Sequence, residues 1–177
     1  GGREEGGLVV VEGDRGRAGR PDLKCYRAHV VKARQYADIV KVSDGDLEHL
    51  ALSGTTAREK AGQLLQRCSA KLLALSCGAE GAYLLTRSGQ VFQARETAPL
   101  VVRDTVGAGD CFLAGLVRTL LESDMAAAWG NAELDHATVQ SLLHNAVASA
   151  SLCVQRRGCV PPSRAEVLAH VAAGSIA

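Results

Sequence analysis

The 177-residue chain is poor in aromatic residues, in excess charge and in long apolar runs. Aromatic residues make up 3% of it, and its formal net charge is +1 with basic residues scattered along its length. It therefore lacks the basic stripe and the stacking platform that nucleic-acid binding needs. No apolar run approaches the length of a membrane span, and residues 1–7 contain no apolar signal segment. We expect a cytoplasmic protein that binds neither nucleic acid nor membranes, with residues 1–7 disordered.

The six cysteines are widely spaced, and no two of them form a Cys-x-x-Cys pair. The five histidines are unclustered as well, so the sequence does not favour a zinc site. Several cysteines fall in apolar stretches, where a free thiol packs as a small hydrophobic group. Because no export signal is present, reduced core cysteines are favoured over a disulfide framework. The six are Cys25, Cys68, Cys77, Cys111, Cys153 and Cys159.

What the chain does contain is a regular alternation of β-prone and helical segments, in a composition that is 47% apolar. Strands that alternate with helices predict an α/β fold with a mostly parallel sheet flanked by helices. The sequence shows no internal repeat and no boundary to a second domain, so we expect a single domain over residues 1–177. The predicted strands cover 8–11, 37–42 and 71–76, a hairpin covers 82–92, and helices cover 26–36, 44–52, 55–68, 111–123, 138–154 and 163–173.

Three of the predicted helices have capping residues at their start. Ser43 precedes a short helix with Asp46 at its third position, a variant of the capping box. Thr55 or Thr56 caps the next helix, and Ser163 caps the last one after a proline pair that stops the preceding element.

The most informative stretch is a glycine-containing loop, residues 104–110, which follows apolar residues and leads into a helix. Unpaired amides at a helix start, added to the positive end of its dipole, favour a phosphate group. Gly107 and Gly109 have no Cβ to keep that phosphate from the backbone. Asp110 would repel the phosphate, so its expected use is chemical, as acceptor of a hydroxyl proton. A tight turn with an ordinary capping aspartate is the alternative.

Two further segments follow predicted strands. Ser76-Cys77-Gly78-Ala79-Glu80-Gly81 places two glycines after a strand, where nucleotides bind in open α/β sheets, although such glycines also serve turn geometry alone. Ser43 and Asp46 follow the preceding strand, where a ligand could also bind. Helix capping is the alternative role for these two residues, and the two roles are compatible.

The string Asp-Thr-x-Gly-Ala-Gly-Asp, from Asp104 to Asp110, resembles the second signature of the PfkB/ribokinase family of carbohydrate kinases. The resemblance implies a three-layer ribokinase-like fold. It also implies that the amides of Gly107, Ala108 and Gly109 form an anion hole, and that Asp110 is the catalytic base.

The resemblance extends to the supporting segments. Residues 76–81 are similar to the family's Thr-x-Gly-x-x-Gly segment, with Ser76 in the place of threonine, which implies nucleotide contacts from Ser76, Gly78, Glu80 and Gly81. Ser43 and Asp46 resemble the Asn-x-x-Glu motif that acts near Mg²⁺ and the phosphates, but both residues differ from it. The family's last long helix carries an asparagine near the nucleotide, which implies this role for Asn145. Counting back from Gly158, however, that position falls on Val147, and an exposed polar helix residue is the alternative for Asn145. The family also implies that Asp104 helps to hold a monovalent cation such as K⁺.

The resemblance therefore implies an ATP- and Mg²⁺-dependent sugar kinase, most similar to fructokinase, which phosphorylates a primary hydroxyl. The chain looks like the C-terminal, nucleotide-binding portion, without the family's N-terminal sugar-anchoring part and lid. The alternative is a non-catalytic nucleotide-binding fragment or truncated kinase, and exposed core would favour a homo-oligomer. A dinucleotide-binding module is disfavoured because the Gly-x-Gly-x-x-Gly fingerprint is absent.

Overall fold

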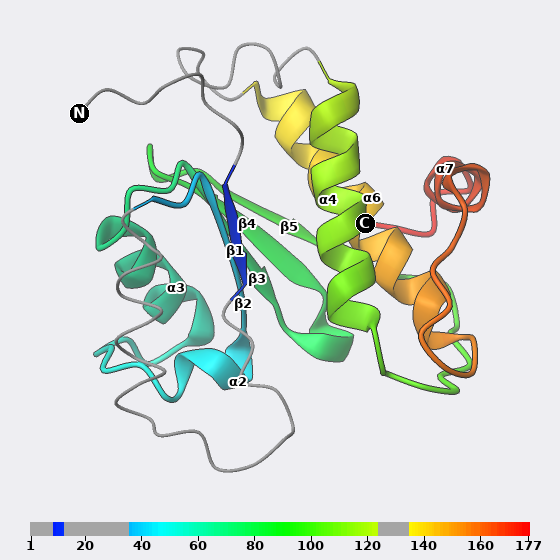
Figure 1. The fold of residues 1–177 in the computed structure, drawn as a ribbon, viewed down its shortest axis with the longest axis horizontal. Coiled ribbons are helices and arrows are strands. Elements are labelled where there is room, and N and C mark those ends of the chain that lie inside the picture. The colour runs from blue at the N-terminus through cyan, green and yellow to red at the C-terminus, as the bar shows by residue number, and fades with distance from the viewer. Residues whose placement is uncertain (1–8, 13–35, 124–134) are drawn as a thin grey trace. The chain divides into compact units, whose positions relative to one another are not determined.

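The computed structural model describes residues 9–12, 36–123 and 135–177, which fall into two compact units (Figure 1). Unit 1 comprises Gly1–Ser76 and Leu84–Val91, and unit 2 comprises Cys77–Tyr83 and Phe92–Ala177. The expected disorder of residues 1–7 and nearly all of the helix expected over 26–36 lie outside the described residues.

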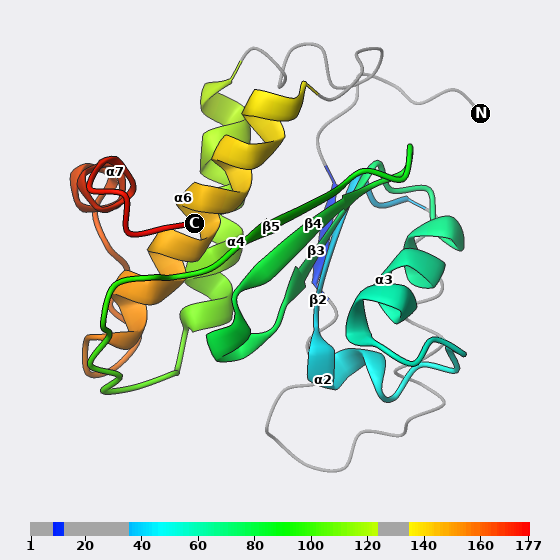
Figure 2. The same cartoon turned by 180° about the vertical axis from the view of Figure 1, so that it is seen from behind.

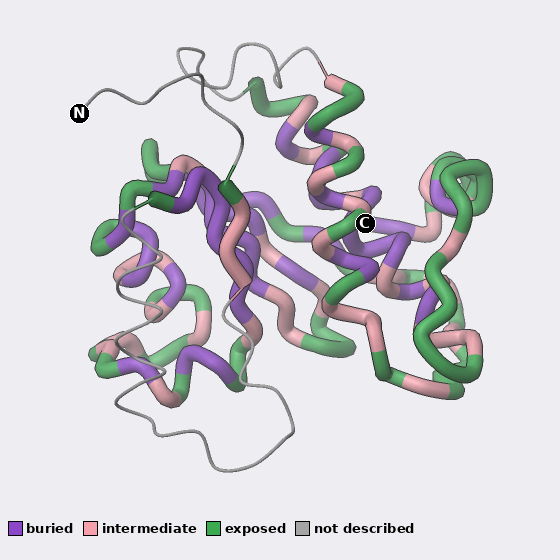
Figure 3. The backbone as a smooth tube through the Cα atoms, viewed as in Figure 1, coloured by how far each residue is buried: buried purple, intermediate pink, exposed green. Residues whose placement is uncertain are grey.

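Unit 1 is built on three parallel strands, β1 (Val10–Glu12), β2 (Ile39–Ser43) and β3 (Leu72–Ser76). The first four residues of β2 and of β3 are all buried, as expected of strands in the interior of a parallel sheet. Figure 3 shows both strands in the colour of buried residues. The register pairs Ser43 with Ser76, so the two strands end side by side.

The short helix α2 (Asp44–Leu47) and the helix α3 (Ala57–Gln66) complete the helical part of unit 1. Both begin with capping boxes. The box of Ser43 and Asp46 is the one that the sequence predicts, whereas for α3 the sequence predicts only a cap at Thr55 or Thr56, and the structure shows Thr56 paired with Glu59. The predicted helix over 44–52 is too long, because the chain tightens after Leu47. The amides of His49 and Leu50 bond to carbonyls three residues back, not four.

The five strands follow the order β1-β2-β3-β4-β5, with β4 at Ala82–Thr86 and β5 at Val91–Ala94. The amide of Cys77 bonds to the carbonyl of Gly81, and the amide of Arg87 bonds to that of Lys71. These bonds join opposite ends of β3 and β4, so β4 runs antiparallel to β3. The sheet is therefore mixed, not mostly parallel, because the turn after β3 is too short for a crossover.

Unit 2 contains the 3₁₀ turn η1 (Gly78–Glu80) and the helices α4 (Ala108–Glu122), α6 (His136–Val154) and α7 (Arg164–Ala172). Helices α4 and α6 lie side by side in both views (Figures 1 and 2). They approach closely at Gly115, where an added Cβ would lie 2.9 Å from the carbonyl oxygen of Asn145.

The capping residues of unit 2 fix where its helices begin. Helix α6 begins two residues before the predicted start, because Asp135 accepts the amide of Thr138 at 2.9 Å. Ser163 caps α7 as predicted. No helix in the described part of the chain is both long and apolar enough to cross a membrane.

Candidate active site

The loop that enters α4 is tied down by the carboxylate of Asp104. Its Oδ1 accepts the amide of Val106 at 3.0 Å, and its Oδ2 accepts the amide of Gly158 at 2.9 Å. The amides of Arg103 and Asp104 both bond to the carbonyl of Val154 at the end of α6. Asp104 thus joins the start of the loop to the turn that follows α6.

Helix α4 begins at a glycine in the left-handed conformation. Gly107 is the N-cap, with φ of 80° and ψ of 0°, a region that residues with a Cβ adopt at a cost. The amide of Ala108 donates weakly to the carbonyl of Thr105, at 3.3 Å. The amides of Gly107, Gly109 and Asp110 have no acceptor among the residues that the structure describes. These donors, at the positive end of a helix dipole, are suited to an anion.

Asp110 lies in the first turn of α4 and is exposed. Its carboxylate forms no hydrogen bond or ion pair with any described residue. An acidic side chain in a first helical turn is stabilised by the helix dipole. A carboxylate that has no described partner and lies next to unpaired amides can take a proton from a group that approaches those amides.

The two glycines of the predicted nucleotide segment differ in their surroundings. Gly81 has φ of 91°, and an added Cβ would lie 2.7 Å from the Cβ of Arg95 and closer still to the carbonyl of Ala94. Gly78 has φ of 54°, but nothing lies within 4 Å of the position that a Cβ would take. A glycine is therefore needed at position 81 because the backbone there packs closely on Ala94 and Arg95, whereas Gly78 leaves open space beside its backbone. Glu80, between them, is exposed.

In unit 1, Ser43, Asp46 and Ser76 are together at the ends of β2 and β3. One oxygen of the buried Asp46, Oδ2, accepts both the hydroxyl of Ser43 at 2.6 Å and its amide at 3.0 Å. The other oxygen has no partner among the described residues. The capping interpretation of this pair is confirmed, and one carboxylate oxygen remains unused by it.

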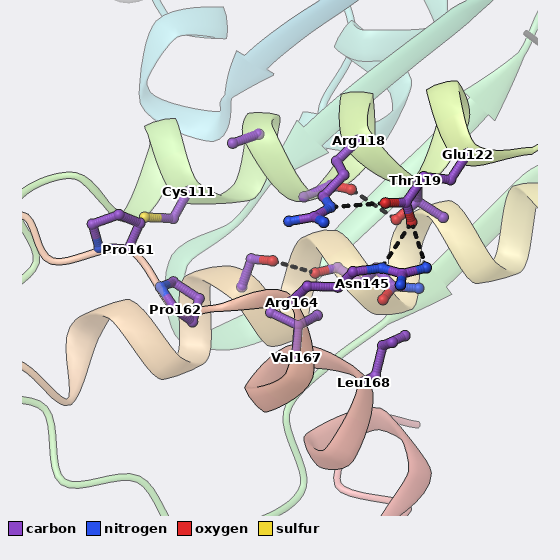
Figure 4. A pocket seen from close by; sticks show the side chains of 13 residues that line it. Cys111, Arg118, Thr119, Glu122, Asn145, Pro161, Pro162, Arg164, Val167 and Leu168 are labelled. Carbon is purple, nitrogen blue, oxygen red and sulfur yellow. Dashed lines mark hydrogen bonds and ion pairs between the residues drawn. The ribbon is translucent and has the colours of Figure 1, made fainter.

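Asn145 lies away from the α4 N-terminus. It lines a cavity of about 110 Å³ between α4, α6 and the start of α7, next to Gly115 (Figure 4). Gly115 is seven residues into α4, about 10 Å along the axis from its start. The side chain is buried, and its Nδ2 donates to the carbonyl of Ser141 at 2.9 Å.

The rim of this cavity carries an ion network. Glu122 accepts from Arg118 at 3.0 Å and from Arg164 at 3.1 Å, as the dashed lines of Figure 4 show. The hydrogen bond from Arg118, assisted by Arg164, lowers the pKa of Glu122. Two guanidinium groups share one carboxylate, so the rim is positively charged.

The structure thus brings Asp104, the Gly107 loop and Asp110 together within unit 2, and it groups Ser43, Asp46 and Ser76 within unit 1. In the described ranges, no three His, Cys, Asp or Glu residues are grouped closely enough to hold a metal ion by themselves. Cys159 is exposed, so it is not one of the expected core cysteines, and no sequence pattern predicts that its sulfur packs against Gly107. Such a contact depends on how α6 ends, which no local motif encodes.

Comparison with known proteins matches residues 20–166 to the model of the pfkB family of carbohydrate kinases. Aminoimidazole riboside kinase of Salmonella typhimurium is 33% identical over 132 residues, which are 74% of this chain and 37% of that enzyme. A fructokinase of Rhizobium leguminosarum bv. trifolii is 33% identical over 120 residues, 68% of this chain and 36% of the fructokinase.

A solved structure shares the fold. Aminoimidazole riboside kinase from Salmonella enterica, complexed with aminoimidazole riboside and an ATP analogue, superposes with a TM-score of 0.73 at 24% identity. The match covers 93% of this chain and 52% of that one. The chain therefore spans about half, or less, of the length of these three relatives.

Proposed function

This chain belongs to the pfkB family of carbohydrate kinases, and we propose that it acts in the ATP-dependent phosphorylation of a sugar's primary hydroxyl, with fructose or a similar sugar as acceptor. One observation carries the proposal. The exposed carboxylate of Asp110 stands without a partner among the described residues, directly beside the unpaired amides that open α4. A phosphoryl-transfer site needs these two elements next to each other, a base for the hydroxyl and donors for the moving charge.

In the proposed mechanism Asp110 accepts the proton of the sugar hydroxyl while the hydroxyl oxygen of the sugar attacks the terminal phosphorus of ATP. The amides of Gly107 and Gly109 then hydrogen-bond to the phosphoryl oxygens, on which negative charge accumulates. The amide of Ala108 contributes less, because it already donates to Thr105. The bond to the ADP oxygen breaks as the new oxygen–phosphorus bond forms.

The nucleotide is proposed to lie against the turn that follows β3. Gly78 supports this, because the space beside its backbone is open. Ser76 offers a half-buried hydroxyl at the end of β3, and Glu80 and Gly81 complete the segment. Asn145 is the weakest member of the set, because it lines the cavity about two turns along α4.

Mg²⁺ fits one feature of unit 1. Asp46 keeps one carboxylate oxygen that capping does not use, and such an oxygen can order a water of the ion. Mg²⁺ would neutralise phosphate charge when bound. Asp104 already accepts two backbone amides, so its proposed share in a monovalent cation site is to hold the Gly158 turn in place.

Replacing Asp110 by asparagine tests the assignment. Loss of a general base lowers a rate by roughly 10²–10⁴-fold, so Asp110→Asn should lower turnover by about this factor while ATP affinity stays nearly unchanged. Glu48→Gln is the matched control, because it removes an exposed carboxylate outside the proposed site. Equal loss of activity in both variants, or loss of ATP binding in Asp110→Asn alone, would argue against the proposed base.

A nucleotide-binding protein without turnover is the second candidate, because the open space beside Gly78 and the unpaired amides that open α4 suit a nucleotide and its phosphates whether or not a sugar binds. Calorimetry separates the two. Binding of ATP-Mg followed by binding of fructose, with formation of ADP, supports the kinase. Binding of ATP-Mg alone supports the second candidate, and no binding of ATP-Mg refutes both.

A further inference from the structure

Three thiols lie beside the loop that opens α4. Cys111 belongs to the first turn of α4, Cys153 to the last turn of α6, and Cys159 to the segment after it. The Cys153 sulfur lies 3.9 Å from the carbonyl oxygen of Val106 and shares a hydrogen bond with the Cys111 thiol. All three cysteines are free.

Cys159 packs directly on the N-cap of the helix. A Cβ added to Gly107 would lie 2.9 Å from the Cβ of Cys159 and would overlap its sulfur. The Cys159 sulfur therefore rests on the Cα of Gly107. Figure 4 shows the Cys111 sulfur pointing toward Pro161, two residues after Cys159. The Cys111 sulfur therefore faces the segment that carries Cys159, and Cys159 is near enough to raise the pKa of Cys111.

The three thiols differ in how easily a reagent reaches them. Cys159 is exposed, whereas Cys111 and Cys153 are buried. Burial, with the hydrogen bond to Cys153 and the nearby Cys159, raises the pKa of Cys111 to about 12. Cys111 therefore stays protonated at neutral pH and does not react first, because the thiolate is the nucleophile.

We propose that Cys159 is an oxidation site for hydroperoxides, and that its oxidised form closes an intramolecular disulfide with Cys111 across the loop of Gly107. This covalent chemistry does not depend on the proposed kinase activity.

The reaction has two balanced steps. The Cys159 thiolate attacks the hydroperoxide; a sulfur–oxygen bond forms, the oxygen–oxygen bond breaks, and an alkoxide or hydroxide leaves and takes up a proton. The Cys111 sulfur then attacks the sulfenic acid; the disulfide forms, the sulfur–oxygen bond breaks, and the leaving hydroxide takes the Cys111 proton as water. In sum, two thiols and one hydroperoxide give a disulfide, an alcohol and water.

The disulfide would tie the Gly158 turn to the first turn of α4. The Gly158 turn already donates its amide to Asp104, and Asp110 is the residue before Cys111. Oxidation would therefore restrict the motion of the loop that carries the unpaired amides, and a thiol reductant would reverse the change.

The sequence suits a mass-spectrometric test, because trypsin places all six cysteines in six different peptides. Cys111 lies in 104–118, Cys153 in 119–156 and Cys159 in 158–164. The full chain is treated with hydrogen peroxide, the monomer fraction is isolated, and free thiols are blocked before digestion. We expect peptide 104–118 to be linked to peptide 158–164, and the link to disappear on reduction.

Three variants make the test specific. Cys159→Ser should abolish the link. Cys111→Ser should abolish it too but leave a sulfenic acid at Cys159, trapped by a cyclic dione. Cys68→Ser, which alters a buried thiol of unit 1, should keep the link. The proposal is overturned if Cys159 stays reduced, if its disulfide joins two chains, or if it pairs with a cysteine other than Cys111.

Discussion

Replacing Gly107 by alanine tests whether the loop that opens α4 is held in place by backbone conformation and by Cys159. Gly107 has φ of 80°, and no residue other than glycine has a positive φ in the described part of the chain. A methyl group at this position would also meet the side chain of Cys159. Gly107→Ala should therefore lower the free energy of unfolding for two separate reasons.

The size of the effect follows from the two contributions. A residue with a Cβ in the left-handed region costs roughly 1–2 kcal/mol. Rotation of the Cys159 sulfur can relieve its overlap, but the Cys159 Cβ would remain 2.9 Å from the new methyl, so the backbone must shift. Overpacking of this kind costs about 1–3 kcal/mol. We expect Gly107→Ala to destabilise the protein by about 2–5 kcal/mol in total.

A double-mutant cycle with Cys159→Gly separates the two contributions. The glycine removes the sulfur and the Cβ, which leaves the Cys159 Cα at 3.4 Å from the added methyl, close to ordinary contact. The coupling energy between the two changes should then be about 1–3 kcal/mol. Urea unfolding of the four proteins, followed by far-ultraviolet circular dichroism, measures it. A Gly107→Ala variant as stable as the parent, or a penalty that Cys159→Gly leaves unchanged, would refute the reasoning.

Three further predictions concern other positions. Gly81→Ala should be about 2–4 kcal/mol more destabilising in urea unfolding than Gly78→Ala, since only Gly81 meets neighbouring backbone; equal losses would contradict this. Asp104→Ala should cost about 1–2 kcal/mol, because the amides of Val106 and Gly158 lose a carboxylate acceptor, and Asp104→Asn should cost less. The third concerns Glu59, whose pKa is lowered from 4.5 to about 2 by hydrogen bonds from Thr55 and Thr56. Ionised Glu59 therefore stabilises the fold above pH 4.5, and the stability difference between the parent and Glu59→Gln should shrink as pH falls from 4.5 toward 2. A difference that does not change with pH would contradict the third prediction.

Local chemistry allowed much of the fold to be predicted from the sequence. The capping residues Ser43, Thr56 and Ser163 start their helices where expected, because a side-chain oxygen three residues before an unpaired amide is a local arrangement. The hairpin over 82–92 was found for the same reason, from a short glycine-containing turn between two β-prone runs.

Features that depend on distant segments could not be predicted. Lys41 is buried in β2, and its charge is compensated by Glu12, the residue opposite it in β1. The register of the two strands sets this pair, and 28 intervening residues give no local sign of it. The expectation of a mostly parallel sheet was also wrong, because it followed from the alternation of strands and helices, whereas the short turn after β3 makes β4 antiparallel to β3.

The pair of Ser43 and Asp46 shows why a capping role and a site role need not compete. Both hydrogen bonds that Asp46 accepts from Ser43 end on Oδ2, so capping fixes the carboxylate and leaves Oδ1 without a partner among the described residues. Ser43 in turn accepts the amide of Asp46 and ends β2 opposite Ser76. Ser43 and Asp46 have shorter side chains than the Asn and Glu of the Asn-x-x-Glu motif, but together they still hold a carboxylate rigidly where two parallel strands end. Because a rigid acid loses little entropy on binding a hydrated ion, the cap itself favours the proposed role near Mg²⁺.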